Sequence, residues 1–203
     1  MRIMAENDLV SCYTIAKYKP HKSISNEDKV SNIVDKKLDN RDLLDVVVSD
    51  LTYVRVVGKW NYVCLILDLH NREIIGYSTS LNKDAELAYQ AFVTIKYDLS
   101  RISIFHADRG NKFKNNTIDG ILDTFDIDRS LSKKGCPYDK TVTEATFKTF
   151  KVEFVYQHVF ENMNDLRLEL FDYENSYNNI RLHSSLCYLL PITYRNSHLK
   201  KVV

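Results

Sequence analysis

The chain has 203 residues, of which 44% are hydrophobic, and its 28 Lys and Arg nearly balance its 27 Asp and Glu. This length fits one full domain with a short extra segment, and it buries a core without needing disulfide or metal staples. The four cysteines are widely spaced and form no C-x-x-C pair, which indicates reduced thiols rather than a disulfide framework or a zinc site. No apolar run reaches the roughly 18 residues of a membrane span, and the N-terminus lacks a signal-peptide core, so we expect a cytoplasmic protein without membrane contact.

Residues 1–44 differ from the rest of the chain because they are polar, are interrupted by Pro20 and end in a run of charged residues. We expect a short helical remnant near residues 2–8, followed by an extended basic linker. A folded core is predicted for residues 45–191 and a basic tail for residues 192–203.

Three windows carry a local excess of positive charge although the formal net charge is only +1. They lie at residues 9–26, at residues 129–154 and in the last eleven residues, which include Arg195. Such windows suit contact with phosphates. In a chain with 27% charged residues, chance clustering explains them equally well.

Three β-strands are predicted from β-branched and apolar runs at residues 45–54, 60–69 and 73–78. The second and third runs are joined by His70-Asn71-Arg72, a loop of hairpin length that contains Asn. Three consecutive antiparallel strands are the simplest arrangement.

The remaining elements alternate between helices and short strands. A helix is predicted over residues 83–97, where apolar residues recur at spacings of three and four and Asn82 is placed to cap the first turn. It is followed by a strand at 101–106, a helix at 116–125, a strand at 127–131, a helix at 141–155 and a helix with an apolar stripe at 163–177. The stripe indicates a packing face, against either the core or a partner. This order matches a ribonuclease H-like α/β fold, in which helices flank a mixed five-stranded sheet, with an extra C-terminal helix.

Three carboxylates fall where this fold brings distant chain segments together. Asp50 lies within the first strand, Asp108 directly follows the fourth strand, and Glu144 lies in the first turn of the third helix. A carboxylate inside an apolar strand is costly to bury unless a partner compensates it. Converging carboxylates hold two divalent ions about 3.5–4 Å apart in phosphoryl-transfer sites, and magnesium prefers oxygen ligands. The pattern therefore favours a two-metal site.

Each of these acids also has a structural explanation. Asp50 suits a strand end, Asp108 suits an Asx turn before Gly110, and Glu144 interacts favourably with a helix dipole. Asp68 is a fourth carboxylate late in a strand, and we assign it to bracing the hairpin turn that follows rather than to the site.

The helix at 141–155 has two different faces. Three phenylalanines share one of them: Phe147, Phe150 and Phe154. Glu144, Lys148 and Lys151 share another, at i, i+4 and i+7. An ordinary amphipathic helix with a Glu–Lys pair explains this pattern as well as a helix that holds a metal through Glu144 and directs both lysines at DNA phosphates.

In six segments the chain resembles the catalytic core of DDE transposases and retroviral-type integrases. The resemblance is closer to the catalytic subunit of bacterial insertion elements whose transposase is made by frameshifting between two reading frames. The segments are SDLTYV, LILDLHNREIIGYS, HADRGNKF, SLSKKGCPYDK, TEATFKTFKVE and YNNIRLHSSLCYLLP. They run from about Asp45 to Pro191 in the family's order, and 35 residues separate Asp108 from Glu144.

The resemblance implies that Asp50, Asp108 and Glu144 form a metal-binding catalytic triad for two Mg²⁺ or Mn²⁺ ions. It also implies that Lys151, seven residues past Glu144, is the basic residue near the donor DNA end. We further expect DNA contacts from Lys148 on the same helix face, and from Lys140 and Arg109 near the site. The implied activity is that of a DDE-type DNA transposase or integrase, which nicks DNA at an element end and transfers the strand to a target without a covalent protein–DNA intermediate.

The resemblance also implies partners and two competing functions. The partners are DNA, both element ends and target, further copies of the chain in a transpososome, and the product of the other reading frame. One alternative is a catalytically silent, truncated transposase that binds DNA or the full transposase as an inhibitor. The other is a ribonuclease H-like nuclease that hydrolyses without strand transfer. The chain departs from the family at three positions, since the family usually has Ser or Thr at Ala107, Asn at Lys140 and Gly at Cys187.

Overall fold

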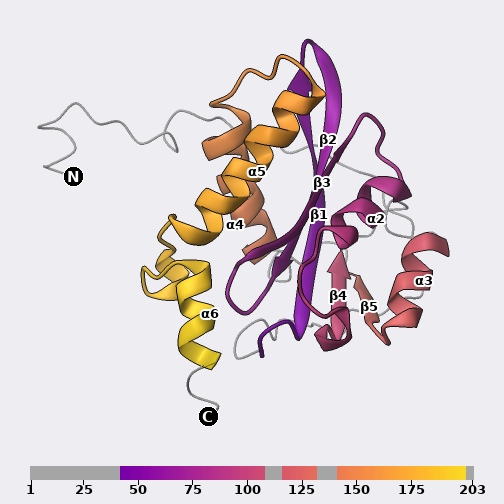
Figure 1. Cartoon of the computed structure of the whole chain (residues 1–203), viewed down its shortest axis with the longest axis vertical. Helices are drawn as coiled ribbons and strands as arrows, with labels where there is room; N and C mark the ends of the chain where they lie inside the picture. Colours follow the sequence, from indigo (N-terminus) through magenta and orange to yellow (C-terminus); the bar gives the residue numbers. More distant parts are fainter. Residues whose placement is uncertain (1–41, 108–115, 132–140, 200–203) are drawn as a thin grey trace, which may run out of the picture.

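The structure, a computed structural model, describes residues 42–107, 116–131 and 141–199. These residues form a mixed five-stranded sheet with the order β3-β2-β1-β4-β5 and with helices on both faces (Figure 1). The predicted ribonuclease H-like fold class is confirmed. The N-terminal remnant and linker expected at residues 1–44 lie almost entirely outside the described residues. Within the described part of the chain, no helix is long and apolar enough to cross a membrane.

The sheet combines two antiparallel pairings with two parallel ones. Its strands are β1 (Val46–Val56), β2 (Lys59–Asp68), β3 (Ile74–Ser80), β4 (Ile104–Ala107) and β5 (Asp128–Leu131). The pairs β1–β2 and β2–β3 are antiparallel, as predicted, whereas β4 lies parallel to both β1 and β5. A two-residue turn joins β1 to β2, and both of its residues have positive φ, 44° at Val57 and 78° at Gly58, as a type I′ hairpin requires.

Helices cover both faces of the sheet. They are α2 (Ala85–Val93), α3 (Asn116–Thr124), α4 (Thr141–Phe150), α5 (Met163–Asn179) and α6 (Pro191–Leu199). Shorter turns are η2 (Leu99–Arg101), the π-helical turn η4 (Lys151–Val155) and η5 (Ser184–Leu186). Helix α6 was not predicted, because residues 192–203 were expected to form only a basic tail.

The predicted cap and ends of α2 were wrong. Asp84, not Asn82, caps the helix, because its carboxylate accepts a hydrogen bond from the backbone N–H of Leu87. The helix ends at Val93 rather than near residue 97. There the Thr94 hydroxyl accepts a hydrogen bond from the backbone N–H of Tyr77 in β3, at 2.9 Å, so a tertiary contact replaces the next helical turn.

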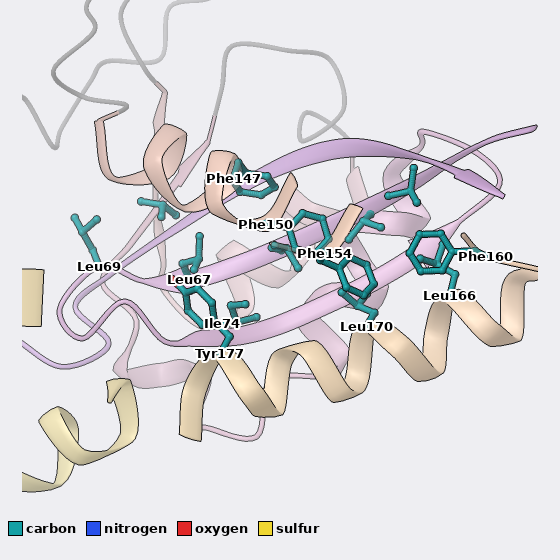
Figure 2. Packing of buried hydrophobic residues seen from close by; sticks show 14 of the residues in the cluster. Leu67, Leu69, Ile74, Phe147, Phe150, Phe154, Phe160, Leu166, Leu170 and Tyr177 are labelled. Atoms are coloured by element: carbon teal, nitrogen blue, oxygen red, sulfur yellow. The ribbon is translucent and has the colours of Figure 1, made fainter. Parts of the chain in front are cut away.

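Strand β1 separates two hydrophobic cores. Its even-numbered apolar residues, such as Val48 and Val54, pack with α4 and α5, whereas odd-numbered ones, such as Val47 and Leu51, pack with α2 and α3. In the first core the rings of Phe150 and Phe154 are stacked at 5.0 Å. Figure 2 shows these rings between the sheet and α5.

The apolar stripe predicted for residues 163–177 packs against this first core. Leu166, Leu170 and Tyr177 are buried members of it, and Met163 and Tyr173 are partly buried against it. Burying a leucine side chain contributes about 1.5–3 kcal/mol. The stripe is therefore a core face, which resolves the two alternatives left open by the sequence.

Asn178 ties α5 to the start of β3. Its Oδ1 accepts from the backbone N–H of Ile74, and its Nδ2 donates to the carbonyl of Ile74, both at 2.9 Å. Nδ2 also donates to Glu174 at 2.6 Å. The buried amide thus satisfies both backbone groups of Ile74 on the outer side of β3, the edge strand of the described sheet.

A buried carboxylate, Glu73, joins α6 to the same hairpin. Its oxygens accept from Arg195 at 3.0 Å, from Tyr97 Oη at 2.6 Å and from Asn71 Nδ2 at 2.8 Å. Burial raises the pKa of Glu73, and the hydrogen bond from Asn71 and the charge of Arg195 oppose that rise. Arg195, counted among the bases available to phosphates, is only 16% exposed and is engaged in the fold.

Asp68 braces the end of β2, as the sequence predicted. It is fully buried, and its two oxygens accept backbone hydrogen bonds from His70 at 2.9 Å and from Leu44 at 3.0 Å. Burial raises the pKa of this carboxyl from 3.8 to about 6, against the lowering effect of the two N–H donors. The charged form is therefore less favourable in the folded state than in the unfolded chain.

We predict that Asn178→Ala lowers the free energy of unfolding by about 2–3 kcal/mol, because the buried N–H and C=O of Ile74 lose their partners. Urea unfolding followed by circular dichroism measures this loss. Asn179→Ala is the matched control, since Asn179 is the next residue, is exposed and bonds to Asn175 within its own helix. Equal losses in the two variants would contradict the assigned role of Asn178.

Asp68 also predicts a pH dependence of stability. The folded pKa of about 6 lies above the unfolded value of 3.8. The protonated Asp68 therefore contributes its full stabilisation to the folded state below pH 3.8, and this stabilisation is lost as the pH rises through 6. We compare the free energy of unfolding of the wild type with that of Asp68→Asn. The wild-type value minus the variant value should fall by up to about 3 kcal/mol between pH 4 and pH 7. Urea melts across this range test it, with Asp123→Asn on the exposed side of α3 controlling for the loss of one charge. A flat or rising difference would refute it.

Candidate active site

Asp50 lies at the point where β1 continues beyond β4. The parallel pairing of the two strands ends at Ser49 and Ala107, so Asp50 is the first residue of β1 past it. Strand alternation places Asp50 on the same face as Val48, the face covered by α4 and α5. Asp50 is half-buried, and its Oδ1 accepts from the backbone N–H of Leu51 at 2.7 Å. The predicted position within an apolar strand is confirmed.

Three of the predicted site residues lie outside the described residues: Asp108, Arg109 and Lys140. The strand that leads to the first two is described. It ends at Ala107, and Asp108 is the next residue in the sequence. On the same strand, His106 pairs with Val48 of β1, and its Nδ1 lies 3.0 Å from the Ser130 hydroxyl of β5.

Glu144 lies in the first turn of α4, as predicted, and its side chain is exposed. The helix packs on the sheet through the buried Phe147 and Phe150, in the core that contains Val48. The helix that carries Glu144 therefore covers the face of the sheet on which strand alternation places Asp50, although the two residues are far apart in the sequence (Figure 1).

The two described lysines of the predicted basic face differ in their surroundings. Lys148 is exposed in the last turn of α4. Lys151 is half-buried and begins the π-helical turn η4, and its Nζ lies 5.7 Å from the centre of the Tyr53 ring. The helix predicted over residues 141–155 is thus α-helical only to Phe150, and the change to π geometry comes where the lysine meets β1.

The end of α5 and the segment that follows it hold α4 and η4 in place. Arg181 forms a two-pronged ion pair with Glu153 of η4, with distances of 2.8 and 2.9 Å. Tyr177 is hydrogen-bonded to Thr146 of α4, and burial raises the pKa of this phenol to about 12. These anchors were missed from the sequence, where Arg181 was quoted in the YNNIRLHSSLCYLLP segment without a role.

His183 completes this anchor as a neutral side chain. It is buried, with its ring centre 4.7 Å from that of Tyr177. Burial, together with the charge of Arg181, lowers the pKa of His183 to about 4. Close by, Cys187 has a positive φ of 55°, a conformation that glycine adopts without strain, which fits the glycine that the resemblance implies at this position.

The chemistry of the described donors fits a hard divalent cation. Asp50 and Glu144 offer carboxylate oxygens, the ligands that Mg²⁺ prefers. Cys64 pairs with Leu51 on β1 and is part of the core on the other face of the sheet; burial raises the pKa of its thiol to about 12, with a further rise from the charge of Asp50. It remains a protonated thiol and does not compete as a soft ligand. Among the described residues no group of three His, Cys, Asp or Glu side chains converges, and one of the three predicted ligands is outside them.

Sequence comparison identifies related proteins. Two family models, both described as Integrase core domain, match residues 44–137 and 144–199. Transposase InsF for insertion sequence IS3A, from Escherichia coli K12, is 33% identical over 154 residues, which cover 74% of this chain and 54% of that protein. The putative transposase InsK for insertion sequence element IS150, from the same strain, is 33% identical over 153 residues, which cover 73% of this chain and 53% of that protein. The chain thus spans about half the length of the curated relatives it matches.

Structural comparison gives the same fold. The HTLV-2 integrase catalytic core domain in complex with magnesium aligns with a TM-score of 0.57 and 11% identity, covering 75% of this chain and 96% of that one. A chain of the simian T-cell lymphotropic virus intasome aligns with a TM-score of 0.62 and 14% identity, covering 96% of this chain and 66% of that one. The family models match both halves of the described fold, and InsF is homologous over 74% of this chain. The chain belongs to the integrase core domain family.

Proposed function

We propose that this chain is the catalytic core of a DNA transposase that nicks DNA at an element end and transfers the strand to a target in a metal-dependent reaction. The observation that carries the proposal is the placement of Asp50, on the face of the sheet that α4 covers and at the first position of β1 beyond its pairing with β4. The homology to InsF, which is named a transposase, supports the same activity.

The strand register supports a triad of Asp50, Asp108 and Glu144. Ser49 and Ala107 are the last paired residues, and Asp50 and Asp108 follow them in the sequence. Adjacent strands lie about 4.8 Å apart, so a register that continued by one residue would put the two carboxylates side by side. Glu144 comes from the helix that packs on the same face.

These three carboxylates would hold Mg²⁺ or Mn²⁺, and two ions are expected. The bound ions supply activation of the attacking oxygen and stabilisation of the leaving one. The structure of the HTLV-2 integrase core, which has the same fold, is that of the domain in complex with magnesium. This supports the choice of metal.

The basic residues of the chain would position the DNA. Lys148 is exposed one helical turn after Glu144, so its ammonium suits a phosphate beside the carboxylate. Lys151 begins the π-helical turn and is held near Tyr53, which suits a phosphate farther along the strand. Arg109 and Lys140 are proposed to contribute further DNA contacts. No protein nucleophile is required, since the attacking groups are water and then the freed 3′-hydroxyl.

Partners and location are proposed on the same basis. DNA, at element ends and at the target, is the substrate. Further copies of the chain would join in a transpososome, and the product of the other reading frame would recognise the element ends. In a bacterial cell such a protein acts at the nucleoid.

We predict that Asp50→Asn and Asp108→Asn each reduce Mg²⁺-dependent nicking and joining by about a hundredfold or more, because each removes a charged metal ligand. The assay combines a supercoiled plasmid with a 3′-hydroxyl oligonucleotide and analyses the products on a gel. Asp123→Asn, on the exposed side of α3, is the matched control and should keep full activity.

The same products separate transposase from nuclease. Joined oligonucleotide supports strand transfer, whereas nicks without joining favour a ribonuclease H-like nuclease. Undiminished nicking in Asp108→Asn would remove that residue from the site.

Metal binding should also appear as a gain in stability. An ion bound only by the folded chain at a hundredfold excess over its Kd adds about 2.7 kcal/mol, which raises Tm by several degrees for a chain of this size. Differential scanning fluorimetry with and without Mn²⁺ measures the shift, and Asp108→Asn should abolish most of it. A shift of equal size in wild type and variant would place the metal elsewhere.

A further inference from the structure

Exposed aromatic rings lie beside cations along the part of the β1–β2 hairpin that leads to its turn. We call this surface the hairpin platform, and it consists of Tyr53, Arg55, Trp60 and Lys151. The rings of Tyr53 and Trp60 meet edge to face with their centres 5.1 Å apart. The guanidinium of Arg55 lies 5.3 Å from the centre of Trp60, and Lys151 Nζ lies 5.7 Å from the centre of Tyr53.

The platform remains open to a ligand although its members touch one another. Trp60 is 53% exposed and Tyr53 is 45% exposed, whereas core aromatics such as Phe150 and Phe154 are fully buried. Exposed aromatic rings of this size, packed side by side, commonly mark a binding surface rather than a core.

The charge around the platform is uniformly positive along the hairpin. Between Tyr53 and Tyr62 the sequence holds Arg55 and Lys59 and no acidic residue. Lys83, which begins the approach to α2, extends the pattern because its Nζ lies 5.7 Å from the centre of the Tyr62 ring. Cations thus alternate with aromatic rings along the hairpin. This composition is typical of protein surfaces that bind single-stranded nucleic acid.

The platform begins next to the proposed active site but on the other face of the sheet. Tyr53 lies three residues after Asp50, about 10 Å along the strand, and alternation turns it away from the α4 face. Lys151, seven residues after Glu144, connects the two faces through its contact with Tyr53. A strand leaving the carboxylates past Lys151 would therefore meet the platform within about three nucleotide steps.

The platform is also held rigid. The turn between β1 and β2, next to the platform, is hydrogen-bonded to the segment before α5. The backbone N–H of Val57 donates to the carbonyl of Phe160 at 3.3 Å. Phe160 is buried in the first core. Preformed rings lose little conformational freedom when a base stacks on them, which favours binding.

We propose that the hairpin platform binds unpaired bases of the DNA strand that flanks the reacting phosphate, by stacking on Trp60 and Tyr53 while Arg55 and Lys151 contact the backbone. This inference rests on the proposed function, because it assigns to the platform the strand that leaves that site. Stacking tolerates any base, so the platform increases the affinity for DNA and stabilises unpaired bases at its end, without recognising their sequence.

Trp60 supplies a direct test because it is the only tryptophan in the chain. A fluorescent single-stranded thymidine oligonucleotide is titrated into the full chain carrying Asp50→Asn, with EDTA present, and anisotropy measures binding. Tryptophan emission is followed in parallel with the unlabelled oligonucleotide. We expect binding to quench the emission of Trp60, whereas an abasic oligonucleotide of the same length and charge should bind more weakly and quench little.

Variants separate stacking from charge. Trp60→Ala should weaken binding of the thymidine oligonucleotide by about tenfold to a hundredfold and leave binding of the abasic one unchanged. Trp60→Phe should restore part of the loss. Phe171→Ala, at a residue of α5 that is 50% exposed and lies outside the platform, is the matched control and should bind as the wild type does. Thermal melts verify that each variant is folded.

The outcomes distinguish this inference from the proposed function. Equal affinity for both oligonucleotides, binding without quenching, or no binding at all would overturn the platform. Quenching that depends on protein concentration without DNA would assign the surface to a second copy of the chain and would also overturn it. Base-dependent quenching in a chain that neither nicks nor joins DNA would support the platform while refuting the proposed catalytic activity.

Discussion

The packing of α4 and η4 on one face of β1 is the constraint on which the rest of the site depends. The rings of Phe147, Phe150 and Phe154 are buried between the sheet and α5, and this burial selects the face on which Glu144 is presented. Because alternate residues of β1 point to opposite faces, the same packing decides that Asp50 is on the side of α4. A shift of one residue in the register of β1 would move Asp50 to the other core.

Buried polar groups give this apolar packing a defined arrangement. Glu73 and Asn178 join the hairpin between β2 and β3 to α6 and α5. Tyr177 joins the end of α5 to α4, and Arg181 joins the segment after α5 to η4. Each of these groups is costly to bury without its partner, so alternative docking positions of the helices are disfavoured. The end of α5 and the segment that follows it therefore act on the proposed site at a distance, by fixing the helix that carries Glu144.

The two faces of the sheet have different proposed roles in the reaction. The α4 face carries the described carboxylates of the proposed triad, and the hairpin platform lies on the opposite face, near the turn that joins β1 to β2. Lys151 belongs to both, since it lies on the helical segment that follows Glu144 and contacts Tyr53. The π-helical turn begins at this residue, whose ammonium lies 5.7 Å from the centre of the Tyr53 ring on β1.

The sequence by itself determined the order of the strands and helices from β1 to α5, the fold class and the position of Asp50 and Glu144 within their elements. These features follow from local periodicity, because burial of one face imposes a repeat of two on strands and of about 3.6 on helices. The tertiary structure decided the rest. The cap of α2 moved to Asp84, α2 ended where Thr94 bonds to β3, and the apolar stripe of α5 proved to be core. The anchors at Glu73, Asn178 and Arg181, and the contact of Lys151 with Tyr53, join residues that are far apart in the chain, and no local pattern specifies which distant partner a polar or cationic side chain will find.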